Sequence, residues 1–158
     1  MKLAILPLIL AGALFAPTAS FAHPHRMTAK VVHSRAAQGD TIAPRQLLRL
    51  LRGPEAHRPL VLQVGFKVLY DGGHIPGSTF AGPASSPDGL AALDRTVKGV
   101  SRSREIVVYC GCCPWQHCPN VQPALAELRR QGFHDVRALY IPRDFYADWI
   151  EQGLPVAR

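Results

Sequence analysis

From residue 41 onward, short apolar runs alternate with stretches in which apolar residues recur every three or four positions. The short runs predict β-strands at 59–64, 78–83 and 135–141. The run at 105–110, Glu-Ile-Val-Val-Tyr-Cys, is apolar and β-branched after its first residue, which is typical of a strand buried on both faces of a sheet. We therefore expect the run at 105–110 to be the most buried strand of the fold.

The stretches between these runs predict helices. The first helix is expected at 44–51, with Pro44 in its first turn. The second is expected to be capped by Asp88 and to end near Gly99, and the last to be capped by Asp144. The apolar positions expected to face the core are Leu90, Leu93 and Val97 in the second helix, Val121, Ala124, Leu125 and Leu128 in the third, and Phe145, Tyr146, Trp149 and Ile150 in the last. Strands that alternate with helices indicate an α/β fold with a central parallel sheet and helices on both faces.

The first residues have the features of a secretory signal peptide. Lys2 precedes an apolar run, and small residues precede an expected cleavage after Ala22. An uncleaved membrane anchor is the alternative, although the run is short for a bilayer span. We expect a signal peptide at 1–22, a lead-in segment at 23–40 and one domain at 41–158. The mature protein would then be periplasmic or secreted and would not contact the membrane.

The formal net charge is +7, but the Lys and Arg residues are scattered along the chain. Nucleic-acid sites mass such residues with interleaved aromatic ones, so we expect no nucleic-acid partner. A basic surface favours small anionic substrates. We expect a small anionic partner and a monomeric protein.

All four cysteines, Cys110, Cys112, Cys113 and Cys118, lie in one stretch, VVYCGCCPWQHCPN at 107–120. Cys110 would end the buried strand, and in an α/β fold sites form at the carboxyl ends of strands. Pro123 places the start of the next helix at Asn120 or later, because proline fits only the first helical positions. The loop would therefore meet a helix N-terminus, which stabilises a thiolate.

Three interpretations of these cysteines stay open. An oxidising compartment favours disulfides, and Cys113 and Cys118 are the most plausible pair because the residues between them can turn. The four cysteines, together with His117, also offer enough ligands for zinc or Cu(I). The third interpretation is a reactive Cys110 with a neighbouring cysteine that resolves it into a disulfide. The loop contains no Lys or Arg, which argues against a clamp for phosphate or arsenate oxyanions.

Several segments resemble the rhodanese family, in the family's order. They are GGHIPGS at 72–78, the strand IVVYC, the helix closing in QGFHDVRAL at 131–139 and the tail DWIEQGLPV at 148–156. The resemblance implies an α/β domain whose strand-end cysteine takes a sulfane sulfur from a donor such as thiosulfate and passes it to a thiol or protein acceptor. It implies that Cys110 is the nucleophile and that His74 has a structural role. No cofactor is expected.

The sequence departs from the family pattern around the expected site. Gln63-Val64-Gly65 stands where the family usually has Asp-Val-Arg, and Pro142-Arg143-Asp144 stands where it tends to have paired glycines. The loop is also longer and adds Cys112, Cys113 and Cys118 as supporting or resolving thiols. Arg143 and His117 are the candidates for binding an anionic substrate. A copper- or zinc-binding module that uses the four cysteines is the alternative function.

Overall fold

The computed structural model of the protein describes residues 40–158. The predicted signal peptide at 1–22, and the lead-in segment apart from its last residue, lie outside the described residues. Within residues 40–158, no helix combines the length and the apolar character needed to cross a bilayer.

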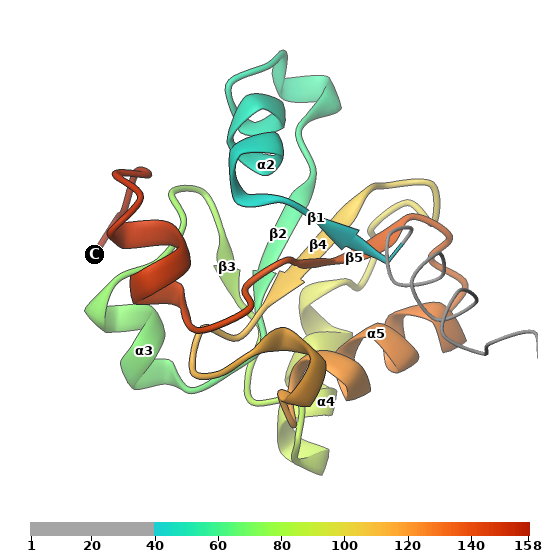
Figure 1. The fold of residues 1–158 in the computed structure, drawn as a ribbon. Helices are drawn as coiled ribbons and strands as arrows, with labels where there is room; N and C mark the ends of the chain where they lie inside the picture. Colours follow the sequence, from blue (N-terminus) through green and yellow to red (C-terminus); the bar gives the residue numbers. More distant parts are fainter. Residues whose placement is uncertain (1–39) are drawn as a thin grey trace, which may run out of the picture.

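Five parallel strands form one sheet in the order β1-β5-β4-β2-β3. The strands are β1 (Thr41–Ile42), β2 (Leu60–Gln63), β3 (Thr79–Phe80), β4 (Ile106–Tyr109) and β5 (Val136–Leu139). The apolar runs in the sequence predicted all of them except β1, which has too few residues to show a pattern. Strand β4 pairs with β2 on one side and β5 on the other, so its carboxyl end lies in the middle of the sheet edge (Figure 1).

Helices cover both faces of the sheet, as the alternating pattern predicts. The helices are α2 (Pro44–Leu51), α3 (Lys67–Gly72), α4 (Pro87–Thr96) and α5 (Val121–Arg130), with short turns η1 (Glu55–His57), η2 (Trp115–His117) and the π-helical η3 (Tyr146–Ile150). Helix α2 and η3 pack on one face, and α4 and α5 on the other (Figure 1). The expected α/β fold with a parallel sheet is confirmed.

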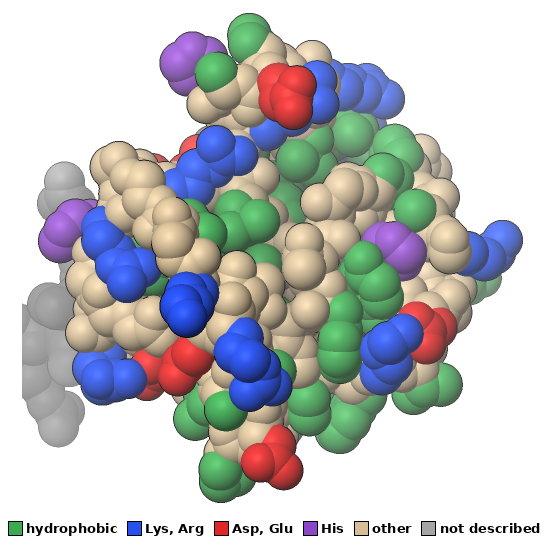
Figure 2. Space-filling model, turned by 180° about the vertical axis from the view of Figure 1, so that it is seen from behind, with side chains coloured by type: hydrophobic (Ala, Val, Ile, Leu, Met, Phe, Trp, Pro, Cys, Tyr) green, Lys and Arg blue, Asp and Glu red, His purple; other side chains and the backbone are tan. Residues whose placement is uncertain are grey.

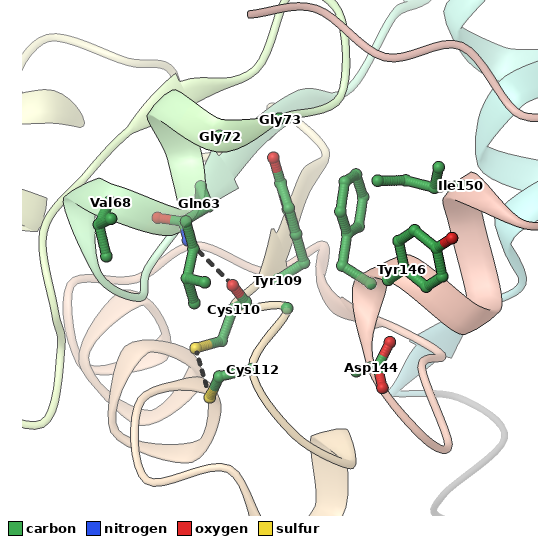
Figure 3. A pocket seen from close by; sticks show the side chains of 13 residues that line it. Gln63, Val68, Gly72, Gly73, Tyr109, Cys110, Cys112, Asp144, Tyr146 and Ile150 are labelled. Atoms are coloured by element: carbon green, nitrogen blue, oxygen red, sulfur yellow. Dashed lines mark hydrogen bonds between the residues drawn. The ribbon is translucent and has the colours of Figure 1, made fainter.

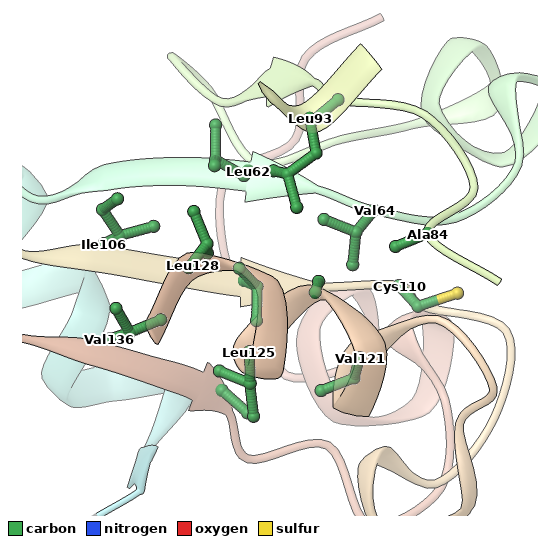
Figure 4. Packing of buried hydrophobic residues seen from close by; sticks show 14 of the residues in the cluster. Leu62, Val64, Ala84, Leu93, Ile106, Cys110, Val121, Leu125, Leu128 and Val136 are labelled. Carbon is green, nitrogen blue, oxygen red and sulfur yellow. The ribbon is translucent and has the colours of Figure 1, made fainter. Parts of the chain in front are cut away.

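The two faces of the sheet bury separate apolar clusters, and β4 contributes to both. Val107 and Tyr109 join the cluster under α2 and η3, whereas Ile106 and Val108 join the cluster under α4 and α5 (Figure 4). All four residues of β4 are buried, which confirms the strand expected to be buried on both faces. Cys110 continues the alternation and belongs to the cluster under α4 and α5.

Two of the predicted helix features are wrong. Helix α4 is capped by Ser86, whose Oγ accepts a hydrogen bond from the backbone N–H of Gly89, while Asp88 lies in its first turn. Pro87 occupies the first helical position, which places the cap at Ser86, two residues before the predicted Asp88. Tyr146, expected in the core, is 61% exposed. The backbone N–H of Glu151 bonds the carbonyl of Tyr146, and this wider π-helical turn carries the ring outward.

Basic side chains are dispersed over the surface. On the face seen in Figure 2, Lys and Arg alternate with neutral, acidic and apolar groups and do not form a continuous patch. This distribution agrees with the scattered basic residues of the sequence.

Candidate active site

Cys110 follows β4 directly and lies at a pocket of about 440 Å³ at the carboxyl edge of the sheet. Cys112 lines the same pocket, and the two sulfurs lie close together at its base (Figure 3). Gly111 between them has a φ of +92°, and a side chain there would contact Phe145. Cys110 therefore lies at the strand end, where the sequence places it, and its role as a nucleophile stays a prediction.

Gln63 and Gly65, at the end of β2, hold Cys110 from the neighbouring strand. The buried Gln63 side chain donates a hydrogen bond from Nε2 to the Cys110 carbonyl at 2.9 Å, and its Oε1 accepts one from the Gly65 N–H at 3.1 Å. Gly65 is needed for space, because a Cβ at this position would lie 2.5 Å from the Cys110 sulfur. The sulfur thus occupies the volume that a side chain at position 65 would fill.

The loop brings the cysteine sulfurs together. The sulfur of Cys112 lies 3.2 Å from that of Cys110 and 3.0 Å from that of Cys113. The sulfurs of Cys110, Cys112 and Cys118 all lie within 4.8 Å of one another. Cys110 and Cys118 are buried, whereas Cys112 is exposed. The loop therefore places one accessible thiol beside two protected ones.

Asn120 is fully buried and links Cys110 to the loop before α4. It stands at the predicted N-cap of α5, but its side chain does not cap the helix. Instead, Nδ2 donates to the Cys110 sulfur at 3.4 Å, and Oδ1 accepts a hydrogen bond from the Ser85 N–H at 2.9 Å. The residue at the cap position thus orients the sulfur.

The pKa values of Cys110 and Cys118 shift in opposite directions. The neighbouring Cys118 sulfur, together with burial, raises the pKa of Cys110 far above the usual range of a thiol. The neighbouring Cys110 thiol, assisted by the backbone N–H groups of Asn120 and Val121, lowers the pKa of Cys118 to about 5. The thiolate expected at the helix N-terminus therefore forms on Cys118, which is held against Cys110.

The pocket beside the cysteines is mainly apolar. Val68 of α3 lies across it from Tyr146 and Ile150 of η3 (Figure 3), and Leu69 also lines it. Val68 is 74% exposed, so the rim presents apolar surface to solvent. Among the described residues that line the pocket, Asp144 carries the only formal charge.

Arg143 and His117, the two candidates for substrate binding, are not among the residues that line the pocket. The Arg143 guanidinium donates to Asp148 Oδ1 at 2.9 Å and to the Ala147 carbonyl at 2.9 Å. It therefore supports the turn η3, and its partner is Asp148 instead of the adjacent Asp144. His117 is exposed in η2.

The four cysteines are free in the structure, so the Cys113–Cys118 disulfide is not formed here. Burial raises the pKa of Cys113 to about 12, and sulfur contacts to Cys112 and Cys118 add to the shift. The disulfide expected under oxidising conditions stays a prediction.

His74 has a structural role, as the resemblance implies. Its ring stacks on Tyr70 with centroids 3.9 Å apart, and its Nδ1 lies 2.9 Å from the Tyr70 carbonyl. Its backbone pairs with Ala157. The following turn places Gly77 at a φ of +79° and closes with a hydrogen bond from the Ser78 N–H to the Ile75 carbonyl, as the Pro-Gly pair predicts.

The sequence patterns do not predict the roles of Gln63, Gly65 and Asn120 at the site. Gln63 could have been found as a polar residue that ends an apolar strand at the expected edge. Gly65 stood out only as a departure from the family pattern. The contact of Asn120 with the sulfur depends on the course of the loop, and no local signal reports it.

Fold and site together define an α/β domain with a cysteine at the end of its central strand. The family model for the rhodanese-like domain matches residues 43–140, and the chain belongs to this family. No curated protein sequence matches the chain.

Solved structures show the same fold. The BH2092 protein of Bacillus halodurans has 20% identity and a TM-score of 0.61, with 81% of this chain and 83% of that chain covered. The rhodanese-like domain of the Alr3790 protein from Anabaena has 27% identity and a TM-score of 0.54, over 74% of this chain and 77% of that one. A thiosulfate sulfurtransferase from Pseudomonas aeruginosa has 23% identity and a TM-score of 0.56, over 75% of this chain but 19% of that larger one.

Proposed function

We propose that the protein is an exported sulfurtransferase or thiol redox protein in which Cys110 accepts a sulfane sulfur and Cys112 resolves the persulfide. The observation that carries this proposal is the 3.2 Å separation of the two sulfurs at a pocket on the carboxyl edge of the sheet. Membership of the rhodanese-like family supports sulfur transfer on this scaffold. The export rests on the signal peptide predicted at 1–22.

In the first step, the Cys110 sulfur attacks the sulfane sulfur of the donor. Its proton passes to the Cys118 thiolate, whose sulfur lies within 4.8 Å of that of Cys110. The bond between the sulfane sulfur and the rest of the donor breaks, and the rest leaves with the electron pair. Cys110 then carries a persulfide. The backbone N–H of Cys112 and the side-chain amide of Asn120 face the Cys110 sulfur that bears it.

The persulfide can react in two ways. An external thiol or protein acceptor can take the terminal sulfur and return Cys110 to a thiol. Alternatively, the Cys112 sulfur attacks Cys110, expels the terminal sulfur as hydrosulfide and leaves a Cys110–Cys112 disulfide. In the second case two thiols are oxidised and the sulfane sulfur is reduced by two electrons. An external dithiol then regenerates the protein.

The pocket favours a donor with an apolar body. The basic surface led us to expect a small anionic donor, but the charged residue at the pocket is the carboxylate of Asp144. A dianion such as thiosulfate finds no cationic partner among the residues that line it. An organic donor would contact Val68 and Tyr146 and gain from their burial. We therefore propose an organic sulfane-sulfur compound, such as an aryl thiosulfonate, as the class of donor.

Mass spectrometry of the reduced, metal-free protein tests the proposal. After incubation with benzenethiosulfonate, Cys112→Ser should gain one sulfur atom on Cys110, whereas the wild type should release hydrosulfide and lose two free thiols. Cys110→Ser should do neither. Cys113→Ser, which removes a sulfur that contacts Cys112 but leaves both members of the proposed pair in place, serves as the control and should behave as the wild type. Hydrosulfide release that persists in Cys110→Ser, or a persulfide on another cysteine, would contradict the assignment.

A further inference from the structure

We propose that Cys110, Cys112 and Cys118 form a three-coordinate site for Cu(I), the reduced copper ion. Their sulfurs all lie within 4.8 Å of one another, and the separation between Cys110 and Cys112 is 3.2 Å. An ion between three such sulfurs can bind all of them after small side-chain movements. Within residues 40–158, no other set of three His, Cys, Asp or Glu side chains converges in this way.

Two of the three sulfurs are fixed by structure that exists without the ion. Cys110 ends the central strand, and Gln63 holds its carbonyl. Cys118 lies shortly before α5, where the backbone N–H groups of Asn120 and Val121 bond its sulfur. Only Cys112, on the exposed loop, must adjust to close the site. Such preorganisation, with hydrogen bonds to the ligating atoms, is typical of metal sites.

The surroundings suit a site of three negatively charged sulfurs. N–H groups of Cys112, Asn120 and Val121 face the sulfurs of Cys110 and Cys118, and these partial charges offset the excess negative charge of the complex. Trp115 and Val121 belong to the same buried cluster as Cys110 and Cys118, so two of the ligands lie in apolar surroundings. Water therefore has little access to the ion from the core side.

The ligand set selects Cu(I) over Zn(II). Thiolate ligands are soft and prefer Cu(I), whereas structural zinc sites require four ligands in a tetrahedron. Cys113 contacts Cys112 and Cys118 but does not belong to the converging set. His117 is exposed in η2 and does not belong to it either. The described residues thus provide three converging ligands, all of them sulfur.

Binding requires only that the thiols lose their protons, and neither copper nor sulfur changes oxidation state. The inference is therefore independent of the proposed sulfur transfer. It requires that Cys110, Cys112 and Cys118 are reduced and carry no persulfide. A protein that fails to take up sulfur can still bind the ion.

Titration with Cu(I) under anaerobic conditions tests the site. The full chain, reduced and freed of reductant, should remove one Cu(I) per chain from the chromogenic chelator bicinchoninate. Cys110→Ser, Cys112→Ser and Cys118→Ser should each weaken binding by at least about 100-fold, since even residues that only support a ligand change affinity by about 10- to 100-fold. Cys113→Ser should retain the wild-type affinity. X-ray absorption of the loaded protein should show three sulfur neighbours around copper.

Cys112→Ser decides the test, because Cys112 is exposed and its replacement leaves the core intact. Unchanged Cu(I) affinity in this variant would overturn the proposal. Equal losses in Cys113→Ser and Cys112→Ser would also overturn it, because they would indicate a four-sulfur site. A third contradicting result would be stoichiometric Zn(II) binding that Cu(I) cannot displace.

Discussion

The position of a single sulfur depends on residues that do no chemistry themselves. Gly65 leaves the space, Gln63 fixes the carbonyl and Asn120 donates to the sulfur of Cys110. Each of these groups restricts where the sulfur can lie. Cys110 is therefore held in one place by three residues from two separate segments, the end of β2 and the start of α5.

At this scale we predict that Gly65→Ala displaces the Cys110 sulfur. The added Cβ would lie 2.5 Å from that sulfur and 3.0 Å from Gln63 Nε2, so one of them must move. Overpacking of this kind costs about 1–3 kcal/mol in the free energy of unfolding. Denaturant unfolding measures the cost, and mass spectrometry measures the rate of persulfide formation, which should fall.

Gly72→Ala is the matched control, because a Cβ at position 72 would contact nothing within 4 Å. Its free energy of unfolding should change little or rise slightly, since alanine restricts the unfolded chain. Equal stability of the two variants would show that the sulfur does not occupy the space at Gly65.

At the scale of elements, α3 and η3 form the two walls of the pocket above the strand ends. Helix α3 ends at Gly72, and the adjoining Gly73 packs closely against Val156 of the C-terminal segment. The turn η3 is held by Arg143, through Asp148 and the Ala147 carbonyl. Both walls are therefore supported by residues away from the sulfurs.

We predict that Tyr146→Ala weakens the use of donors with an apolar body. Tyr146 lines the pocket and is 61% exposed, so its removal takes away contact surface without opening the core. Loss of the contact should lower kcat/KM for benzenethiosulfonate about tenfold, the effect of about 1.4 kcal/mol. The kcat/KM for thiosulfate, which has no apolar body, should change little.

Tyr140→Ala provides the comparison, because Tyr140 is also exposed, at 43%, but does not line the pocket. Its kinetics with both donors should match those of the wild type. If Tyr146→Ala lowered kcat/KM equally for benzenethiosulfonate and thiosulfate, the pocket would not select for an apolar body.

At the scale of the whole molecule, the cysteine pair couples folding stability to pH. The lowered pKa of Cys118, about 5, means that the folded protein has lost one thiol proton that the unfolded chain keeps up to about pH 8.5. Stability should therefore rise with pH across this window, by at most about 1.4 kcal/mol per pH unit. Above about pH 8.5 the sign reverses, because folded Cys110 retains a proton that the unfolded chain loses.

Denaturant unfolding of reduced, metal-free protein between pH 5 and pH 9 measures this dependence. The difference in stability between the wild type and Cys118→Ser should grow with pH up to about 8.5. Cys113→Ser should follow the wild type. If the difference in the free energy of unfolding between the wild type and Cys118→Ser did not change with pH, the thiolate would not form on Cys118.

The sequence predicts the architecture better than the site because the two depend on different ranges of interaction. The buried strand at β4 and the apolar stripe of α5 are visible in local patterns, and both lie where these patterns place them. The placement of Cys110 follows from the strand alone. In contrast, Arg143 was a candidate for binding the substrate, but its guanidinium bonds Asp148, five residues further on, and does not line the pocket. Side-chain pairing of this kind follows from the path of a turn, which has no periodic signal.

The supports of Cys110 have a consequence for protein engineering. Gln63 and Gly65 come from the end of β2: Gln63 bonds the Cys110 carbonyl, and Gly65 leaves space for the Cys110 sulfur. The cysteine loop therefore depends on residues outside it for its structure. Grafting residues 110–119 onto another domain of this fold would transfer the four cysteines without the residues that support Cys110. A working transplant must carry the end of β2 with the loop, because the two segments form one structural unit.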